Sequence, residues 1–359
     1  MRIGMVAPPW FTVPPSGYGG IERVVSYLTE GLVERGHEVT LFAAGGSRSS
    51  ANLVETFDAA PSPLLGDPLV EGEHLIEAYS RWREFDIIHD HTRLGILPGI
   101  AVPIPVVHTV HGQVTPEVHR LYRRLAGRVH LIAISENQRN TLPDGLDATV
   151  IWNAVHLPAF PFEAKPGEYL LFVGRMCPEK GVLEALEIAR RSGRRLVLCA
   201  KINEVQEQEY FELVVRPALA GVNVELLAQP SPEELGRLYA GALATLFPIQ
   251  WPEPFGLVMI ESMATGTPVI AFRNGSVPEV IDDGVTGRIC ENVDEAVAAV
   301  EQMSALDRTA CRQRVRELFS APVAVARHEA LYRKLTGQPI SEGPGRDESP
   351  GTMGEPLIR

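Results

Sequence analysis

Short apolar runs alternate with amphipathic segments along most of this 359-residue chain. Gly20 to Glu34 predicts a helix with one apolar side, and Glu38 to Ala43 predicts the strand that follows it. Further strands of the first half are expected at residues 2–8, 86–91, 105–112 and 130–135. Strands that alternate with helices are typical of parallel sheets, because a parallel neighbour is reached only through a long crossover connection. The first half is therefore predicted to form an α/β domain with a parallel sheet.

The second half of the chain repeats this pattern. Its strands are expected near residues 169–173, 195–200, 223–227, 243–247, 268–272 and 287–290. Between the halves, Asn153 to Pro158 carries no periodic pattern and leads into a proline-rich segment, which is typical of a hinge. The length also exceeds what one compact core usually supports. We expect an N-terminal domain over residues 1–153 and a C-terminal domain over 154–320.

The C-terminal end of the chain divides into a helix and a tail. Pro322 suits the first turn of a helix that we place at 321–337, because no backbone N–H is needed there. The remaining residues, 338–359, are rich in Gly, Pro and charge and are expected to be disordered.

Composition excludes several classes of protein. A formal net charge of −12 and a pI of about 5.4 argue against a nucleic-acid partner held by bulk electrostatics. The four cysteines show no C-x-x-C spacing, and no secretory leader is evident, so we expect reduced thiols and a cytoplasmic location. No apolar run approaches the ~20 residues of a membrane span, so membrane contact is expected to be peripheral at most.

Two glutamates of the second half stand seven residues apart, at Glu253 and Glu261. The segment from Leu257 to Ala264 is apolar enough for a buried helix, so Glu253 is expected in the loop before it and Glu261 within it. The start of this helix would present free N–H groups of Phe255, Gly256 and Leu257. Such groups suit a phosphate, whereas carboxylates suit sugar hydroxyls. This pattern predicts a ligand with both.

Two cations follow an apolar strand of the same half. Arg175 and Lys180 leave the carboxyl end of the strand at 169–173, within a loop bounded by Gly174 and Gly181. Open α/β sheets bind ligands at this end of their strands, and paired cations there would neutralise a diphosphate.

The first strand leads into a glycine-rich loop, which includes Gly19 and Gly20, and then into a helix. It departs from a dinucleotide fingerprint, because Glu22 stands where the third glycine belongs and no acidic residue ends the second strand. A nicotinamide site is not expected. The loop can still bring N–H groups to a phosphate from the opposite side of a cleft.

Histidines provide the remaining catalytic candidates. His111 ends an apolar strand just before a glycine, whereas His108 within that strand is expected to be a core residue. His89 and His91 form an H-x-H pair around Asp90, but the sequence offers no third metal ligand at a familiar spacing, so no metal site is expected. Asp90 is a candidate for orienting a histidine or receiving acceptor hydroxyls.

These motifs resemble those of the bacterial glycosyl transferase group 1 family, whose members include phosphatidylinositol mannosyltransferases, glycogen synthases and sucrose-phosphate synthases. The resemblance runs from the Gly17 loop to about Lys334. Its most specific parts are Phe172-Val173-Gly174-Arg175 with Pro178-Glu179-Lys180-Gly181, and the Glu-seven-Glu unit that continues through Gly266-Thr267-Pro268. It implies the GT-B fold, in which two Rossmann-like domains face each other across a cleft.

The resemblance also implies roles for single residues. Arg175 and Lys180 would bind the donor diphosphate, Glu253 the hydroxyls of the transferred sugar and Glu261 the ribose. His111 would contact the donor sugar, and the loop at Gly19 and Gly20 would touch the donor from the N-terminal side. No cofactor or metal would be needed.

We therefore expect a retaining, metal-independent glycosyltransferase that uses a nucleoside diphosphate sugar and an acceptor of unknown kind. Front-face transfer is implied, in which the leaving phosphate deprotonates the acceptor. Three alternatives remain open at this point: a sugar-nucleotide epimerase, a phosphorylase, and a nonenzymatic protein that only binds a sugar nucleotide. Nucleotide base, sugar and acceptor, which could be a small molecule, a glycan or a lipid, have no signature in the sequence.

Overall fold

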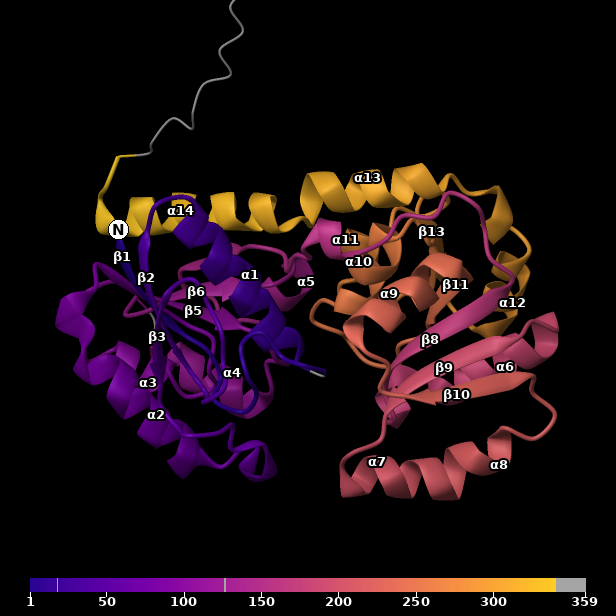
Figure 1. The fold of residues 1–359 in the computed structure, drawn as a ribbon, viewed down its shortest axis with the longest axis horizontal. Coiled ribbons are helices and arrows are strands. Elements are labelled where there is room, and N and C mark those ends of the chain that lie inside the picture. Colours follow the sequence, from indigo (N-terminus) through magenta and orange to yellow (C-terminus); the bar gives the residue numbers. More distant parts are fainter. Residues whose placement is uncertain (18, 126, 340–359) are drawn as a thin grey trace, which may run out of the picture.

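The computed structural model describes residues 1–17, 19–125 and 127–339. These residues form two α/β bodies, each with one parallel sheet, and a long helix that joins them (Figure 1). From residue 340 onward the predicted tail lies outside the described residues. No helix in the described ranges combines the length and the apolar character that crossing a bilayer requires.

The first sheet has seven strands in the order β3-β2-β1-β4-β5-β6-β7, all parallel. The strands are β1 Arg2–Val6, β2 Glu38–Ala43, β3 Asn52–Glu55, β4 Ile87–Asp90, β5 Val106–Val110, β6 His130–Ala133 and β7 Ala148–Val150. Its helices are α1 Gly20–Glu34, α2 Pro68–Ser80, α3 Ile96–Gly99, α4 Pro116–Arg123 and α5 Glu136–Arg139. The inner strands β1, β4, β5 and β6 are buried along nearly their whole length, as expected for strands covered by helices on both faces.

The second sheet has six parallel strands in the order β10-β9-β8-β11-β12-β13. The strands are β8 Tyr169–Arg175, β9 Leu196–Lys201, β10 Val224–Ala228, β11 Ala242–Phe247, β12 Val269–Phe272 and β13 Gly287–Cys290. Its helices are α6 Val182–Ser192, α7 Val205–Tyr210, α8 Arg216–Ala218, α9 Pro232–Gly241, α10 Leu257–Ala264, α11 Val277–Val280, α12 Val293–Val300 and α13 Arg308–Leu318. In both sheets the strand order reverses beside the first strand, β1 or β8, which is where such sheets bind ligands.

Two edge elements were not predicted. Strands β3 and β7 lie at the outer edges of the first sheet, and their residues are half-buried or exposed. An edge strand with little burial does not need a continuous apolar run, so its sequence resembles a loop.

The chain crosses between the two bodies twice, side by side. Val155 donates its N–H to the carbonyl of Phe319, and Ala321 donates its N–H to the carbonyl of Val155, each at 2.9 Å. Helix α14, Ala321–Thr336, then returns over the first body (yellow in Figure 1), where Val325 and Leu331 join the core beneath α1. The C-terminal helix therefore completes the core of the N-terminal half.

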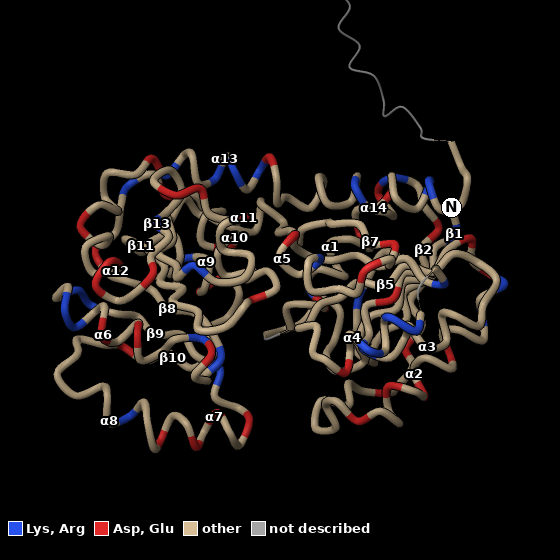
Figure 2. Tube along the Cα trace, turned by 180° about the vertical axis from the view of Figure 1, so that it is seen from behind, with Lys and Arg blue, Asp and Glu red and all other residues tan. Residues whose placement is uncertain are grey.

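The charged residues lie mainly on the helices and loops that surround the two sheets (Figure 2). The strands themselves carry few charges. A charged side chain at the end of a strand is therefore unusual in this fold.

Candidate functional site

A cavity of about 330 Å³ lies between the two bodies, at the carboxyl ends of their strands. This volume is within the range of small-ligand sites. The cavity is lined by His111 and by all the residues predicted to bind the donor, whereas Asp90 does not line it. From the N-terminal side come Gly19, Gly20 and His111, and from the C-terminal side Arg175, Lys180, Glu253, Phe255, Gly256, Leu257 and Glu261.

One wall of the cavity is the start of helix α10. Gly256 precedes the helix with φ 79°, a left-handed conformation that glycine adopts readily. The packing also leaves no room for a side chain at this position, since a Cβ here would lie 2.8 Å from Phe247 Cζ. The tight turn presents the first N–H groups of α10 to the cavity, together with the positive end of the helix dipole. This wall suits an anion.

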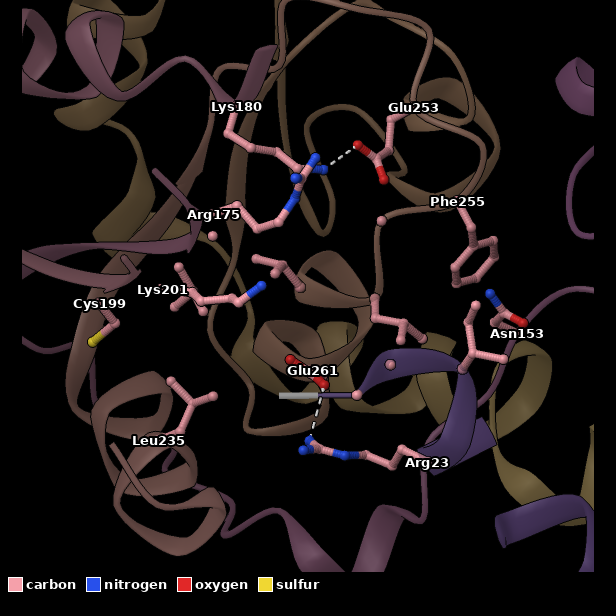
Figure 3. A pocket seen from close by; sticks show the side chains of 18 of the residues that line it. Arg23, Asn153, Arg175, Lys180, Cys199, Lys201, Leu235, Glu253, Phe255 and Glu261 are labelled. Carbon is pink, nitrogen blue, oxygen red and sulfur yellow. Dashed lines mark hydrogen bonds and ion pairs between the residues drawn. The ribbon is translucent and has the colours of Figure 1, made fainter. Parts of the chain in front are cut away.

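Glu253 stands beside this helix start and is paired with Lys180. The Lys180 Nζ donates a hydrogen bond of 2.5 Å to Glu253 Oε2, and the ammonium group lies 5.4 Å from the centre of the Trp251 ring. The two side chains are 17% and 13% exposed, so the pair lies at the cavity surface without being sealed from ligands. Figure 3 shows both side chains on the same side of the cavity as Arg175.

The ends of strands β8 and β9 add two cations side by side. Arg175 and Lys201 are register partners in the parallel pair, and both line the cavity. Below them lies the buried Glu207, whose Oε1 is 3.9 Å from both Arg175 Nη1 and Lys201 Nζ. Lys201 also donates to Glu204 Oε1 at 2.8 Å. The two carboxylates offset the electrostatic repulsion between the neighbouring cations.

Lys201 was not among the predicted residues. It ends a buried strand with a charge, as Arg175 does, and this is the signal that would have found it. Its closeness to Arg175 depends on the pairing of β8 with β9, which the sequence does not state.

Glu261 faces the cavity from inside α10. Its Oε2 accepts a hydrogen bond from the Tyr239 hydroxyl at 3.0 Å. Its Oε1 lies 3.6 Å from Arg23 Nη1, and Figure 3 shows this ion pair. Arg23 belongs to α1, so this ion pair crosses the cleft between the two bodies. Arg23 was also missed, although it follows the predicted glycine loop within one turn of the same helix.

The glycine loop approaches α10 directly. Gly19 precedes α1 with φ 148°, and a Cβ at Gly20 would lie 3.1 Å from Leu257 Cδ1 of the other body. The starts of α1 and α10 therefore face each other across the cavity, which brings two sets of free N–H groups to one ligand volume.

His111 follows β5 and forms part of the N-terminal wall of the cavity. Its Nε2 lies 2.9 Å from Nδ1 of His91, and burial lowers the pKa of His111 to about 3, so its ring is neutral at neutral pH. His108 lies in the core, where its Nε2 is 3.3 Å from the Tyr122 hydroxyl.

Asp90 does not reach the cavity. Its side chain is fully buried and accepts hydrogen bonds from the Tyr79 hydroxyl and from the hydroxyl and N–H of Thr92. Its Oδ1 also lies 3.9 Å from Nδ1 of His108. The structure therefore gives no support to an acceptor-side role, and Asp90 is instead a structural group that holds the turn after β4. The residues that the structure describes contain no group of three or more side chains suited to hold a metal ion.

Comparison with known proteins agrees with this arrangement. The family model described as "Glycosyl transferases group 1" matches residues 158–317, and the model "Glycosyltransferase Family 4" matches residues 18–157. The glycogen synthase of Mycobacterium tuberculosis is 28% identical, with 88% of each chain covered. Among solved structures, AviGT4, a glycosyltransferase involved in avilamycin A biosynthesis, is 27% identical with a TM-score of 0.71 over 94% of this chain and 98% of that one.

A further solved structure, Anabaena HepE in complex with UDP-glucose, shares the fold with a TM-score of 0.73 at 18% identity, over 93% of this chain and 100% of that one. The two family models together span residues 18–317, which include all the predicted donor-binding residues that line the cavity. The chain therefore belongs to the group 1 glycosyltransferases with the GT-B fold, and it is an enzyme that transfers a glycosyl group.

Proposed function

We propose that this enzyme transfers a sugar from a nucleoside diphosphate sugar to an acceptor hydroxyl, with retention of configuration and without a metal ion. One observation carries the proposal. A single cavity contains the start of α10 and the cations Arg175, Lys180 and Lys201, together with the carboxylates Glu253 and Glu261. The structure of HepE with UDP-glucose, which shares the fold, supports the choice of donor class.

The charges match those that the reaction develops. Breaking the anomeric bond adds negative charge to the diphosphate, and preorganised cations and helix N–H groups stabilise such charge strongly in a cavity with little water. In this proposal Arg175 and Lys180 bind the diphosphate and take the part that a metal ion plays in other transferases. Lys201 adds to this cationic wall.

The carboxylates have a different part. Glu253 accepts hydrogen bonds from hydroxyls of the transferred sugar, and Glu261 accepts from the ribose. Each already has a partner in the structure, Lys180 for Glu253 and Tyr239 for Glu261. Neither carboxylate is therefore free to act as a covalent nucleophile. This favours front-face transfer, in which the leaving phosphate takes the proton of the acceptor hydroxyl.

The first experiment is a donor panel. Purified enzyme is incubated with UDP-, GDP-, ADP- and dTDP-sugars, and release of the nucleoside diphosphate is measured with and without a chelator. We expect slow hydrolysis of one donor, unchanged by the chelator, and a product with the anomeric configuration of the donor by NMR. Loss of activity with chelator and its return with magnesium or manganese would refute metal independence. Epimerised donor without nucleotide release would favour the epimerase, and binding without turnover would favour a nonenzymatic binding protein.

The second experiment changes Glu253 to Gln. Hydrogen bonds that involve an ionised group contribute about 1.5–3 kcal/mol, so turnover should fall by about ten- to a hundredfold. Glu168→Gln, at an exposed position of the same domain, is the matched control and should behave as wild type. Unchanged turnover in Glu253→Gln would remove the donor-sugar role of Glu253.

A further inference from the structure

A chain of buried histidines leads away from His111 into the N-terminal domain. His91 contacts His111 through the 2.9 Å pair of ring nitrogens, and the two rings are stacked with centroids 5.1 Å apart and planes 27° apart. His91 is itself 3% exposed and does not line the main cavity. It therefore touches the candidate catalytic residue from behind.

His91 is held in place by the next histidine of the chain. The centroids of His89 and His91 lie 4.0 Å apart. His89 has a partner on each side of its ring: its Nε2 is 2.7 Å from the Thr109 hydroxyl, and its Nδ1 is 2.5 Å from the Tyr332 hydroxyl. Since Tyr332 belongs to α14, this ring stack is clamped between the sheet and the C-terminal helix, which leaves His91 little freedom to turn.

Both rings of the His91 and His111 pair are neutral. Burial lowers the pKa of His111 to about 3 and lowers the pKa of His91 well below its usual value. A neutral imidazole carries one N–H, so one of the facing nitrogens donates and the other accepts. The tautomers of the two histidines are therefore linked.

The other face of His91 indicates which tautomer is present. A small cavity of about 20 Å³, whose lining includes the apolar Val24, Ile151 and Val325, adjoins His91. The Nε2 of His91 has no hydrogen-bond partner among the described residues. A buried N–H without a partner is rarer in proteins than a buried acceptor without one. The proton of His91 then belongs on Nδ1, from which it is donated to His111 Nε2.

We propose that His91 is a positioning residue, which fixes the ring of His111 in one orientation and in the tautomer that carries its proton on Nδ1. His111 can then act on the substrate only as a hydrogen-bond donor, through Nδ1. This suits an oxygen of the donor sugar or the phosphate better than a proton-abstracting role. The inference rests on the proposed role of His111 in transfer.

Two variants of His91 separate positioning from packing. His91→Phe keeps a ring of similar size but removes the donor, whereas His91→Asn loses ring volume but keeps an N–H near the position of Nδ1. We expect kcat to fall by about ten- to a hundredfold in His91→Phe and to recover largely in His91→Asn, while the affinity for the nucleoside diphosphate stays the same in both. His108→Phe is the matched control, because it removes another buried imidazole from the strand that precedes His111.

If His91 only filled space, His91→Asn would be the worse of the two variants, and turnover would follow the melting temperature. That order, or wild-type turnover in His91→Phe, would overturn the positioning role. In His108→Phe we expect a lower melting temperature with little change of kcat.

The tautomer is measured independently of activity, by long-range ¹H–¹⁵N correlation spectra of protein labelled at histidine. We expect the His111 signal to show a protonated Nδ1 and an unprotonated Nε2 in the wild type, and this state to be lost or averaged in His91→Phe. A protonated Nε2 in the wild type would overturn the tautomer assignment. If the spectra agree but no nucleotide sugar turns over, the proposed function fails while the ring pairing stands.

Discussion

At the scale of single residues, buried charge is the main cost of this site, and the structure reduces that cost by pairing. Lys180 with Glu253 and Arg23 with Glu261 each join a cation to a carboxylate at the cavity surface. Ligand groups can replace either partner without leaving a charge buried alone, since a phosphate can take the cation and hydroxyls the carboxylate. Asp90 is different, because it is fully buried and no Lys or Arg forms an ion pair with it among the described residues.

Asp90 predicts a pH dependence of stability. Burial raises its pKa from 3.8 to about 7, against the opposing effect of its hydrogen bonds with Thr92 and Tyr79. The folded state therefore keeps this proton over a window in which the unfolded state loses it. The contribution of the protonated Asp90 to the free energy of unfolding is fully present below about pH 4 and is lost as the pH rises through about 7. Asp90→Asn has no proton to lose, so its free energy of unfolding, relative to wild type, should rise by about 1.4 kcal/mol per pH unit.

Urea denaturation of both proteins at several pH values between about 4.5 and 6.5 measures this slope. Asp86→Asn is the control. Burial by itself would raise the pKa of Asp86, but hydrogen bonds from Arg2 outweigh this effect and lower the pKa below its usual value. Asp86 is therefore ionised throughout this range. The difference in free energy of unfolding between Asp86→Asn and wild type should not change with pH. If the difference for Asp90→Asn is also independent of pH, Asp90 is ionised in the folded protein.

At the scale of elements, the contact between α1 and α14 is unusually close. Gly31 lies in the middle of α1, where glycine is a poor helix former. A Cβ at this position would lie 2.5 Å from Val325 Cγ2 of α14. Glycine is therefore used here for the close approach of two helices rather than for its backbone freedom.

Gly31→Ala tests this contact. Alanine is favoured over glycine in a helix interior by about 1 kcal/mol, yet we expect the substitution to lower the free energy of unfolding, because overpacking in a tight contact typically costs about 1–3 kcal/mol. Shortening the partner in Gly31→Ala with Val325→Ala should remove much of the strain. Thermal and urea unfolding provide the comparison.

Gly72→Ala is the matched control for this substitution. Gly72 lies within α2, and a Cβ there would meet nothing within 4 Å. It should therefore raise the melting temperature. Equal stabilisation by both substitutions would mean that α14 does not pack this closely on α1.

At the scale of the whole molecule, one carboxylate links the two bodies beside the hinge. Glu279, on α11 of the C-terminal body, accepts hydrogen bonds of 2.7 Å from the N–H groups of Glu136 and Asn137, at the start of α5. It also accepts one of 3.2 Å from the indole of Trp152, which directly precedes the hinge. The free N–H groups of one body are thus satisfied by the other, which favours one relative orientation of the bodies.

Glu279→Ala should loosen that orientation. We expect a larger radius of gyration by small-angle X-ray scattering and a lower kcat, because the cavity needs walls from both bodies. Affinity for the nucleoside diphosphate should change little, since Arg175, Lys180 and Lys201 all belong to the C-terminal body. Glu291→Ala, which removes an exposed partner of Arg273 within the C-terminal body, is the control. Identical scattering curves for all three proteins would contradict the role of Glu279.

The sequence predicted much of the fold because regular elements are set by neighbours along the chain. Helix α1 and strand β2 have the predicted bounds, since a continuous apolar side repeats at the period of the element. The short edge strands β3 and β7 were missed, because their partly exposed residues carry no such pattern. The charged residues of the candidate site could also be picked out from the sequence. Arg175 lies at the end of a predicted strand, and Lys180 and Glu253 lie just before predicted helices.

By itself, then, the sequence determined the two parallel-sheet bodies, the family resemblance and the residues that supply charge at the ends of strands. Only the tertiary structure decided which of these residues meet. Lys201 stands beside Arg175 through strand register, Arg23 reaches Glu261 across the cleft, and Asp90 is withdrawn from it. The physical reason is range. Periodicity and capping act over a few residues, whereas these arrangements join segments far apart in the chain. Strand pairing and burial within one body place Lys201 and Asp90, and only the pair of Arg23 with Glu261 depends on how the two bodies pack together.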